Sequence, residues 1–310
     1  MGDARIPLQF SASSLQDYVD CPRRFQLRYA WHVDWPAPEA ELGREQERRT
    51  RLGQELHRLI HQHLVGVPEA LLGAAVHDPQ LACWWRAYLD FARALGDASL
   101  LAETALSMPV AGHRVQARYD VLASYAAGSA RSVPAAERAT NDSTHAARAR
   151  WLIVDWKTYR RHPGRQALAE RLQTRVYPAV LALAGASLNL GRSIDAEQIE
   201  LRFWLAEYPE DAVSFSYSRA KLELDITYIT GLVEQIAGRM GVREGGGSPS
   251  TVWPQAADPR KCLHCCYRSL CQALPTAARP DDCADDETWA PPAGEAAADG
   301  TWDQVQDTAC

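Results

Sequence analysis

Residues 151–158 have the sequence WLIVDWKT, an apolar, β-branched stretch that ends in two charged residues. This pattern predicts a short buried strand. Because side chains alternate across a strand, Asp155 and Lys157 point to one side, whereas Val154 and Trp156 face the other. A carboxylate beside an ammonium group suits a site that holds a divalent cation and a phosphodiester. The same tripeptide also occurs at ordinary strand ends as a surface ion pair.

The length and composition indicate a globular chain with a substantial core. The sequence has 310 residues, of which 46% are hydrophobic. It contains no apolar run long enough to span a bilayer, and its N-terminus lacks a signal-peptide pattern. We therefore expect a soluble, cytoplasmic protein with no membrane partner. In that compartment the eight cysteines are not expected to form a disulfide framework.

The charge is distributed unevenly along the chain. Residues 281–310 contain nine Asp or Glu and no Lys or Arg, so the net charge of −6 becomes about +3 without them (33 basic against 39 − 9 = 30 acidic). Residues 157–175 hold one acidic residue, Glu170, and six basic ones. A basic segment directly after the predicted strand favours phosphate binding, although a solvated helix face has the same composition. The basic residues are Lys157, Arg160, Arg161, Arg165, Arg171 and Arg175.

Hydrophobic periodicity and turn residues predict an alternation of helices and strands. Residues 34–42 and 125–149 have the composition of loops, the second exposed and mobile. The predicted helices cover 11–31 (interrupted at Cys21-Pro22), 43–66, 79–95, 165–186 and 218–241, and the predicted strands form two hairpins, 105–110 with 114–123 and 199–207 with 213–217.

Several polar side chains on these elements are candidates for a site. Asp120 lies on the second strand of the first hairpin, where its partner is either a metal ion or Arg118. His57 follows Gly53 by one helical turn, and Gly53 permits the close approach of another backbone. A histidine in such a place is also common as a packed or surface residue. Glu103, just ahead of the hairpin, is either a further carboxylate of the site or, as its position favours, a surface residue between helix and strand.

Gln173 and Tyr177 are one turn apart on the helix that follows the Asp155 strand. They are either polar surface residues or part of the same site.

The cysteines near the C-terminus form a compact pattern. Cys262, Cys265 and Cys271 are spaced C-x2-C-x5-C, as in metal-centre ligands. Three such ligands require a fourth, and the natural candidate is Cys21, which precedes a proline. A structural zinc site fits the spacing equally well, and the alternative ligands are Cys266 and His264.

Together these segments resemble the RecB-like branch of the PD-(D/E)xK nucleases, in particular members with an iron–sulfur staple. These include the nuclease domain of AddB and the RecB-like CRISPR-adaptation nucleases. The similarity covers about residues 11–275. Ala117 stands where the family usually has Gly, the loop 125–149 is unusually long, and no helicase motif is present. The six motifs, in the family's order, are the opening Ser11 to Phe25 segment with Cys21-Pro22, Gly53-x-x-x-His57, Ala117-Arg118-Tyr119-Asp120, Asp155-Trp156-Lys157-Thr158, Gln173-x-x-x-Tyr177 and the cysteine triplet.

The resemblance implies an α/β, restriction-endonuclease-like fold: a mixed β-sheet core flanked by helices, with the N- and C-terminal segments joined by a cysteine-ligated cluster. We expect one nuclease domain over 1–275 and an acidic tail over 276–310, which is either disordered or folded over the basic groove. Within the domain we expect a helical part (11–97), a sheet core (101–241) and a cluster module (251–275 with Cys21).

The activity implied by the resemblance is that of a Mg²⁺- or Mn²⁺-dependent DNA nuclease, expected to be an exonuclease acting on single-stranded ends. It would serve DNA repair, recombination or CRISPR adaptation, with DNA as substrate and a helicase or related proteins as partners. The rival hypothesis is a non-catalytic or auxiliary DNA-binding subunit with a structural metal cluster. In the nuclease hypothesis His57, Asp120, Asp155 and the Trp156 carbonyl bind the metal ion, Lys157 orients the attacking water, Gln173 and Tyr177 contact the DNA or brace the lysine, and Cys21, Cys262, Cys265 and Cys271 hold a [4Fe–4S] cluster, with Zn²⁺ as the alternative.

Overall fold

The computed structural model describes residues 8–33, 41–126, 150–240, 252–262, 265–268 and 270–271. Most of the predicted loop 125–149 and the acidic tail 276–310 lie outside the described residues. The strands are β1 (Gln9–Ser11), β2 (Ser99–Val110), β3 (His113–Tyr125), β4 (Arg150–Lys157), β5 (Ile199–Leu205) and β6 (Val213–Ser216). The main helices are α1 (Ala12–Asp20), α2 (Pro22–Phe25), α3 (Glu41–Leu64), α4 (Glu69–Ala75), α5 (Pro79–Leu95), α6 (Gly164–Glu170), α7 (Leu172–Ala184) and α8 (Arg219–Arg239).

The strands form one mixed sheet in the order β1-β3-β4-β5-β6, with β2 on the other edge of β3. The pairs β1–β3 and β4–β5 are parallel, and the pairs β2–β3, β3–β4 and β5–β6 are antiparallel. Helices α6 and α7 connect β4 to β5, as a parallel connection requires. The predicted mixed sheet flanked by helices is therefore confirmed.

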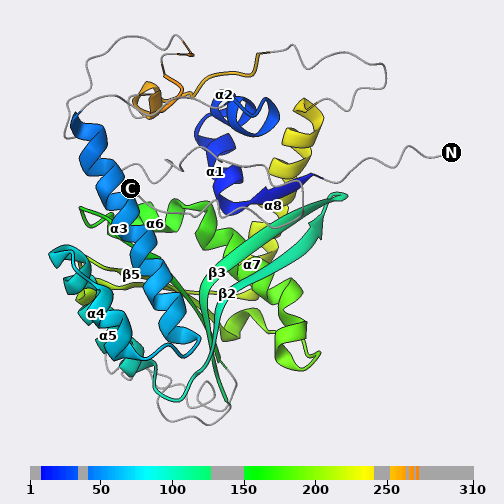
Figure 1. Ribbon diagram of the computed structural model, residues 1–310. Helices are drawn as coiled ribbons and strands as arrows, with labels where there is room; N and C mark the ends of the chain where they lie inside the picture. The colour runs from blue at the N-terminus through cyan, green and yellow to red at the C-terminus, as the bar shows by residue number, and fades with distance from the viewer. Residues whose placement is uncertain are drawn as a thin grey trace.

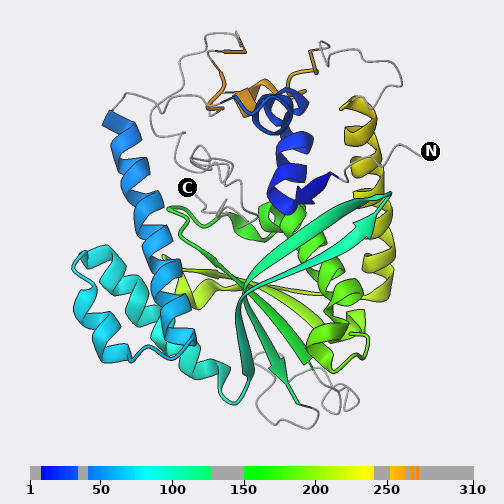
Figure 2. The ribbon, with the colours of Figure 1, turned by 45° about the vertical axis from the view of Figure 1, so that its right-hand side comes forward.

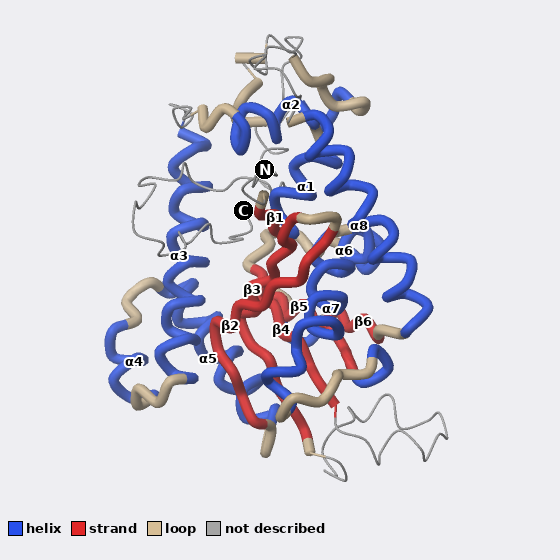
Figure 3. Tube along the Cα trace, turned by 90° about the vertical axis from the view of Figure 1, so that its right-hand side faces the viewer, coloured by secondary structure: helices blue, strands red, loops and turns tan. Residues whose placement is uncertain are grey.

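Helices cover both faces of the sheet (Figures 2 and 3), with α3, α4 and α5 on one side and α6, α7 and α8 on the other. The predicted alternation along β4 explains this sandwich. Val154 and Trp156 belong to the hydrophobic cluster that includes residues of α3 and α5. Ile153 belongs to the second cluster, which includes residues of α7 and α8. Because both faces are covered, all of β4 after Arg150 is buried.

The N-terminal segment begins as the sequence predicts. Ser11 and Ser14 form a capping box, which satisfies amide groups at the start of α1. The helix stops before Pro22, and the Cys21 sulfur accepts a hydrogen bond from the Arg24 amide at 3.4 Å. The short strand β1, which the sequence pattern did not predict, pairs with β3 directly ahead of this cap.

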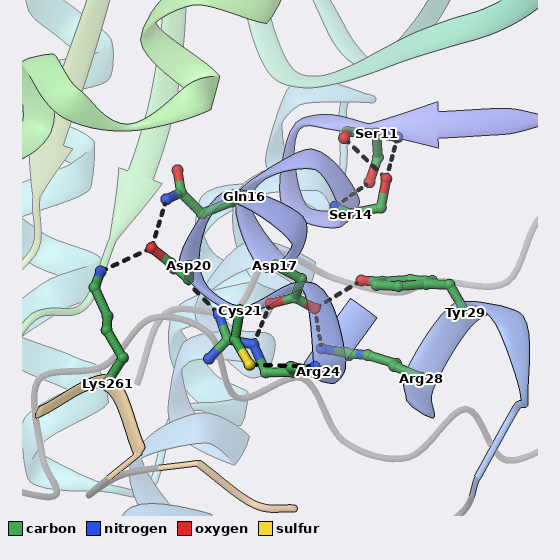
Figure 4. A network of polar contacts seen from close by, with 10 residues as sticks. All are labelled: Ser11, Ser14, Gln16, Asp17, Asp20, Cys21, Arg24, Arg28, Tyr29 and Lys261. Carbon is green, nitrogen blue, oxygen red and sulfur yellow. Dashed lines mark hydrogen bonds and ion pairs between the residues drawn. The ribbon is translucent and has the colours of Figure 1, made fainter. Parts of the chain in front are cut away.

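The N-terminal helix α2 and the C-terminal residues 252–271 are in contact, side by side at the top of Figure 1. Trp253 stacks on Phe25 with 5.8 Å between ring centroids, and its amide donates to the Gln26 side chain at 3.0 Å. The Lys261 ammonium forms an ion pair with Asp20 at 2.7 Å (Figure 4). The two segments therefore meet through aromatic packing and ion pairs, whereas a cysteine-ligated cluster between them is not shown.

One predicted helix proves to be two. Residues 165–186 divide into α6 and α7 because Arg171 adopts an extended conformation, with φ −67° and ψ 141°. The amide of the next residue, Leu172, donates to the side chain of Gln16 on α1 at 2.9 Å. A contact from a distant element thus replaces the backbone hydrogen bond that would have continued the helix.

Candidate active site

The site forms where β3 and β4 separate. On one edge of β3, residues 114–116 pair with β1 and residues 121–125 pair with β4, so positions 117–120 pair with neither. The β3–β4 ladder ends with Val121 opposite Val154. The next positions in the same register are therefore Asp120 and Asp155, which face each other at the fork. Polar groups can meet there because backbone pairing no longer fills the space between the strands.

Asp120 is held from both sides of this fork. One carboxylate oxygen accepts a hydrogen bond from the Trp156 amide at 2.9 Å, and the other lies 3.5 Å from the His57 Nδ1 atom. Burial alone raises the Asp120 pKa, but the His57 charge and hydrogen bond, the Trp156 amide and then Lys157 outweigh it and lower that pKa. Since the amide and carbonyl of one strand residue point to the same edge, the Trp156 carbonyl is directed toward this fork as well.

Asp155 and Lys157 lie on the same side of β4, as the sequence predicts, and form an ion pair at 3.1 Å. Both are almost fully buried, with side-chain exposures of 4% and 2%. The prediction of an adjacent carboxylate and ammonium therefore holds, while the alternative of a surface ion pair is wrong. A buried pair of this kind keeps the ammonium oriented and poorly hydrated.

His57 approaches the fork from α3. Gly53, one turn earlier, faces Thr158, and a Cβ atom there would lie 3.1 Å from the Thr158 hydroxyl. The glycine thus permits the close approach that the sequence predicted, toward a side chain rather than a backbone. Burial lowers the His57 pKa, but the charges of Asp120, Asp155 and Glu103 outweigh burial and raise it.

Of the two places expected for Glu103, the structure shows the less favoured one, as a carboxylate beside the site. Glu103 belongs to β2, not to a linker before the hairpin, and lies between the paired positions Ala102–Val121 and Thr104–Tyr119, as Asp120 does on β3. Among the residues that the structure describes, His57, Glu103 and Asp120 form the group whose ligand atoms all lie within 4.8 Å of one another. One imidazole and two carboxylates are suitable ligands for a divalent cation. The sequence contains one indication of this role, a carboxylate on the neighbouring strand close to the position of Asp120. That position can be assigned only when the register of the hairpin is known.

Gln173 and Tyr177 lie together on α7, where the Gln173 amide donates to the Tyr177 hydroxyl at 3.3 Å. Both residues are buried, at 8% and 3% exposure. The face of the sheet that α7 covers is also the one on which Lys157 lies, 6.0 Å above the Phe203 ring. Of the two roles expected for these residues, burial favours bracing over direct contact with a polymer.

The basic segment 157–175 does not form a single face. Arg160, Arg161 and Arg165 are exposed after β4. Arg165 lies over the Phe215 ring, and Arg175 forms an ion pair with Asp225 at 2.8 Å. The exposed arginines next to β4 remain suited to phosphate binding, whereas the Arg175 charge is compensated within the fold.

The cysteines of the predicted cluster are free thiols on the two contacting segments. Burial raises the Cys262 pKa, as do the neighbouring charges of Cys21 and Cys265. The Cys271 pKa is raised for the same kinds of reason, with Cys265 and Cys21 among the causes. Within the described part of the chain no three of the cysteine sulfurs lie within 4.8 Å of one another. The cysteines are thus near neighbours, but their sulfurs are not arranged around a common metal position.

Next to Cys21, an ionic network connects α1, α2 and the π-helical turn Gln26–Ala30 (Figure 4). Arg24 forms ion pairs with Asp17 at 3.0 Å and with Asp20 at 3.1 Å, and Arg28 forms one with Asp17 at 3.1 Å. The Tyr29 hydroxyl also donates to Asp17 at 3.1 Å. The pKa of Cys266 is lowered first by a hydrogen bond with Cys265 and then by the positive charges of Arg28 and Arg24.

In the described part of the chain, no helix is both long and apolar enough to cross a bilayer.

A histidine and carboxylates beside a buried lysine, at the fork of a mixed sheet, define the class of proteins that act on phosphodiesters with a divalent cation. The comparison with protein families agrees with this class. Residues 9–272 match the model of the PD-(D/E)XK nuclease superfamily, and the chain belongs to that superfamily. Its members are generally nucleases, which implies metal-dependent hydrolysis of phosphodiester bonds.

Among solved structures, the chain is similar to one titled "Crystal structure of SSO0001", with 15% identity and a TM-score of 0.40 over 88% of this chain and 90% of that one. No curated protein sequence matches the chain.

Proposed function

We propose that this protein is a divalent-metal-dependent DNA nuclease, and specifically an exonuclease of the RecB-like type that acts on single-stranded ends. The observation that carries the proposal is the buried Asp155–Lys157 pair, which lies at the fork beside the group of His57, Glu103 and Asp120. A buried lysine next to carboxylates that can bind a metal ion has a direct role in phosphodiester hydrolysis, in addition to compensating the charge of Asp155.

In this proposal the metal ion is held by His57, Asp120, Asp155 and the Trp156 carbonyl. Glu103 is a further ligand. A bound Mg²⁺ or Mn²⁺ supplies Lewis acidity and lowers the pKa of bound water. The Lys157 ammonium holds the attacking water and stabilises charge that develops on the phosphate. The Trp156 amide fixes the orientation of Asp120.

Gln173 and Tyr177 act as positioning residues. Their hydrogen bond, buried on α7, keeps that helix surface in a fixed arrangement on the face of the sheet where Lys157 lies. We assign them the bracing of the lysine rather than contact with the DNA strand.

Cys21, Cys262, Cys265 and Cys271 hold a [4Fe–4S] cluster in this proposal, with Zn²⁺ as the alternative. Cys21 and Cys265 are close enough to affect the Cys262 pKa, which supports a shared centre.

Anaerobically purified protein should be brown and should lose both its cluster and its solubility in Cys21→Ser. The exposed Cys83 supplies the matched control, because Cys83→Ser should change neither property. Colourless protein with one zinc per chain would exclude the iron–sulfur cluster.

The resemblance to RecB-like nucleases supports a cytoplasmic role in DNA repair, recombination or CRISPR adaptation, together with a helicase or other proteins of those pathways.

Cleavage of end-labelled single- and double-stranded DNA, in Mn²⁺ and in EDTA, tests the proposed activity. Asp155→Asn and Lys157→Arg should each lower the rate at least about a hundredfold, the loss typical for a group that assists proton transfer or charge stabilisation. Lys157→Arg retains the positive charge but replaces the compact ammonium with a larger, planar group. Lys221→Met, on an exposed lysine of α8, should cleave like the wild type. Equal activity in all three variants would refute the assignment.

The rival hypothesis, an auxiliary DNA-binding subunit, predicts binding without cleavage under every metal condition. The paired, buried lysine at the fork argues against it, because an auxiliary subunit has no need of such a group. Purified protein that binds DNA but never cuts it would favour the rival.

A further inference from the structure

The ion pair between Arg118 and Glu103 joins a proposed metal ligand, Glu103, to a partly exposed arginine. The Nε atom of Arg118 and one of its terminal nitrogens both lie close to the same oxygen of Glu103, at 2.8 and 2.7 Å. Glu103 at the same time belongs to the group that it forms with His57 and Asp120. One carboxylate is therefore shared between a guanidinium and a set of metal ligands.

The backbone directs Glu103 into this double role. The β2–β3 ladder pairs Ala102 with Val121 and Thr104 with Tyr119, but it skips Glu103 and Asp120 between them. Glu103 has a φ of +48°, which a residue other than glycine adopts at a cost of about 1 kcal/mol or more. The interruption in the ladder turns Glu103 out of the regular strand, at the position facing Asp120.

Arg118 is the partner that a polymer can reach. It precedes Asp120 by two residues on β3, and both residues lie close to Glu103. Its side chain is 38% exposed, whereas that of Lys157 is 2% exposed. A guanidinium with this exposure, beside the proposed cleavage site, is placed to bind a phosphate of the substrate strand.

We infer that the Glu103–Arg118 pair couples cation binding to DNA binding. Without a divalent cation, Glu103 holds Arg118; with the cation bound, the Glu103 carboxylate turns to it, and Arg118 is released to a DNA phosphate. The inference rests on the proposed function and adds a regulatory step to its site.

Physical chemistry supports this exchange of partners. A divalent cation replaces the guanidinium as the counter-charge of Glu103, and the planar fork of Arg118 suits a phosphate as well as a carboxylate. Coupling of this kind is reciprocal, so bound DNA must also raise the affinity for the cation.

The test measures the affinity for a labelled single-stranded oligonucleotide in EDTA and in Ca²⁺, with the integrity of the DNA checked on a gel. The wild type should bind about tenfold more tightly in Ca²⁺, the gain expected for one charge-assisted hydrogen-bonded contact. Arg118→Gln should lose this gain. Glu103→Gln should bind tightly already in EDTA, because nothing then holds Arg118.

A double-mutant cycle separates the switch from simple removal of a negative charge. If Arg118 carries the effect, Glu103→Gln should change nothing in the Arg118→Gln background. Equal tightening in both backgrounds would overturn the inference. Glu55→Gln, which removes a charge from α3 near His57, is the matched control and should bind like the wild type.

A second measurement needs no change at Glu103. Salt titrations of Arg118→Gln should show a slope lower by about one than the wild type in Ca²⁺, but an unchanged slope in EDTA. The same reduction in both states would mean that Arg118 contacts DNA regardless of the cation, which contradicts the switch. Protein that cleaves DNA without such coupling would refute this inference alone, whereas protein that binds no DNA would refute the proposed function as well.

Discussion

Replacing Lys157 by Met tests whether the buried Asp155 carboxylate at the fork needs a positive charge beside it, from either the lysine or a metal ion. Lys157 and Asp155 are 3.1 Å apart, with side-chain exposures of 2% and 4%. Methionine retains most of the apolar volume but removes the charge, so Asp155 is left buried without its ammonium. Removing one partner of a buried pair typically costs about 3–5 kcal/mol. For a domain of this size that corresponds to a Tm lower by about 10 °C.

Urea denaturation followed by tryptophan fluorescence measures this cost, in EDTA and in Mg²⁺. We expect Lys157→Met to be strongly destabilised in EDTA. It should gain more stability from Mg²⁺ than the wild type gains, because the cation replaces the missing ammonium as counter-charge. The double variant Asp155→Asn with Lys157→Met should be more stable in EDTA than Lys157→Met alone, because no buried charge is then left without its partner.

Two outcomes would refute this reasoning. If Lys157→Met is as stable as the wild type in EDTA, the pair contributes nothing and its burial has no electrostatic consequence. If Mg²⁺ stabilises the variant no more than the wild type, Asp155 does not interact with the cation. Lys221→Met, on an exposed lysine that donates to a backbone carbonyl, supplies the control for the loss of a lysine charge.

Further predictions concern pH, the ionic network, the C-terminal segment and the tail. Because His57 has a raised pKa and must be neutral to bind a metal ion, Mn²⁺ affinity should fall as the pH drops through that pKa, and His57→Gln should flatten the dependence in calorimetric titrations. In the metal-free protein the sign is opposite: protonated His57 stabilises the fold below its ordinary pKa of about 6.5, and this contribution disappears as the pH rises through the raised value. Arg24→Met should destabilise the protein by about 3–5 kcal/mol in urea, because Asp17 loses a buried partner. Trp253→Ala, which removes the ring stacked on α2, should cost about 3–5 kcal/mol or release the C-terminal segment to limited proteolysis. Deleting 281–310 removes nine negative charges and should leave DNA affinity equal or higher, with steep salt dependence; a folded truncation that binds more weakly would show that the tail contributes to binding.

The local pattern of the chain determined most of the elements and the centre of the site. Alternating and β-branched residues predicted β4 with Asp155 and Lys157 on one side, and the structure places them so. The helix 79–95, the β2–β3 hairpin and the capped start of α1 followed from caps, turns and periodicity. These features depend on residues a few positions apart, so sequence spacing alone contains the necessary geometry.

Tertiary structure alone decided what depends on the meeting of distant elements. The fork exists because β1 and β4, more than a hundred residues apart, pair with different parts of the same edge of β3. The ligand position of Glu103 follows from the β2–β3 register, and the break between α6 and α7 from the contact of Gln16 with Leu172. Burial likewise decided the chemistry of Asp155 and Lys157. The Asp-x-Lys motif by itself is ambiguous, but an ion pair that is almost fully buried at the fork is a specific chemical arrangement. No local propensity contains that information, because it arises from which surfaces exclude water once the chain is folded.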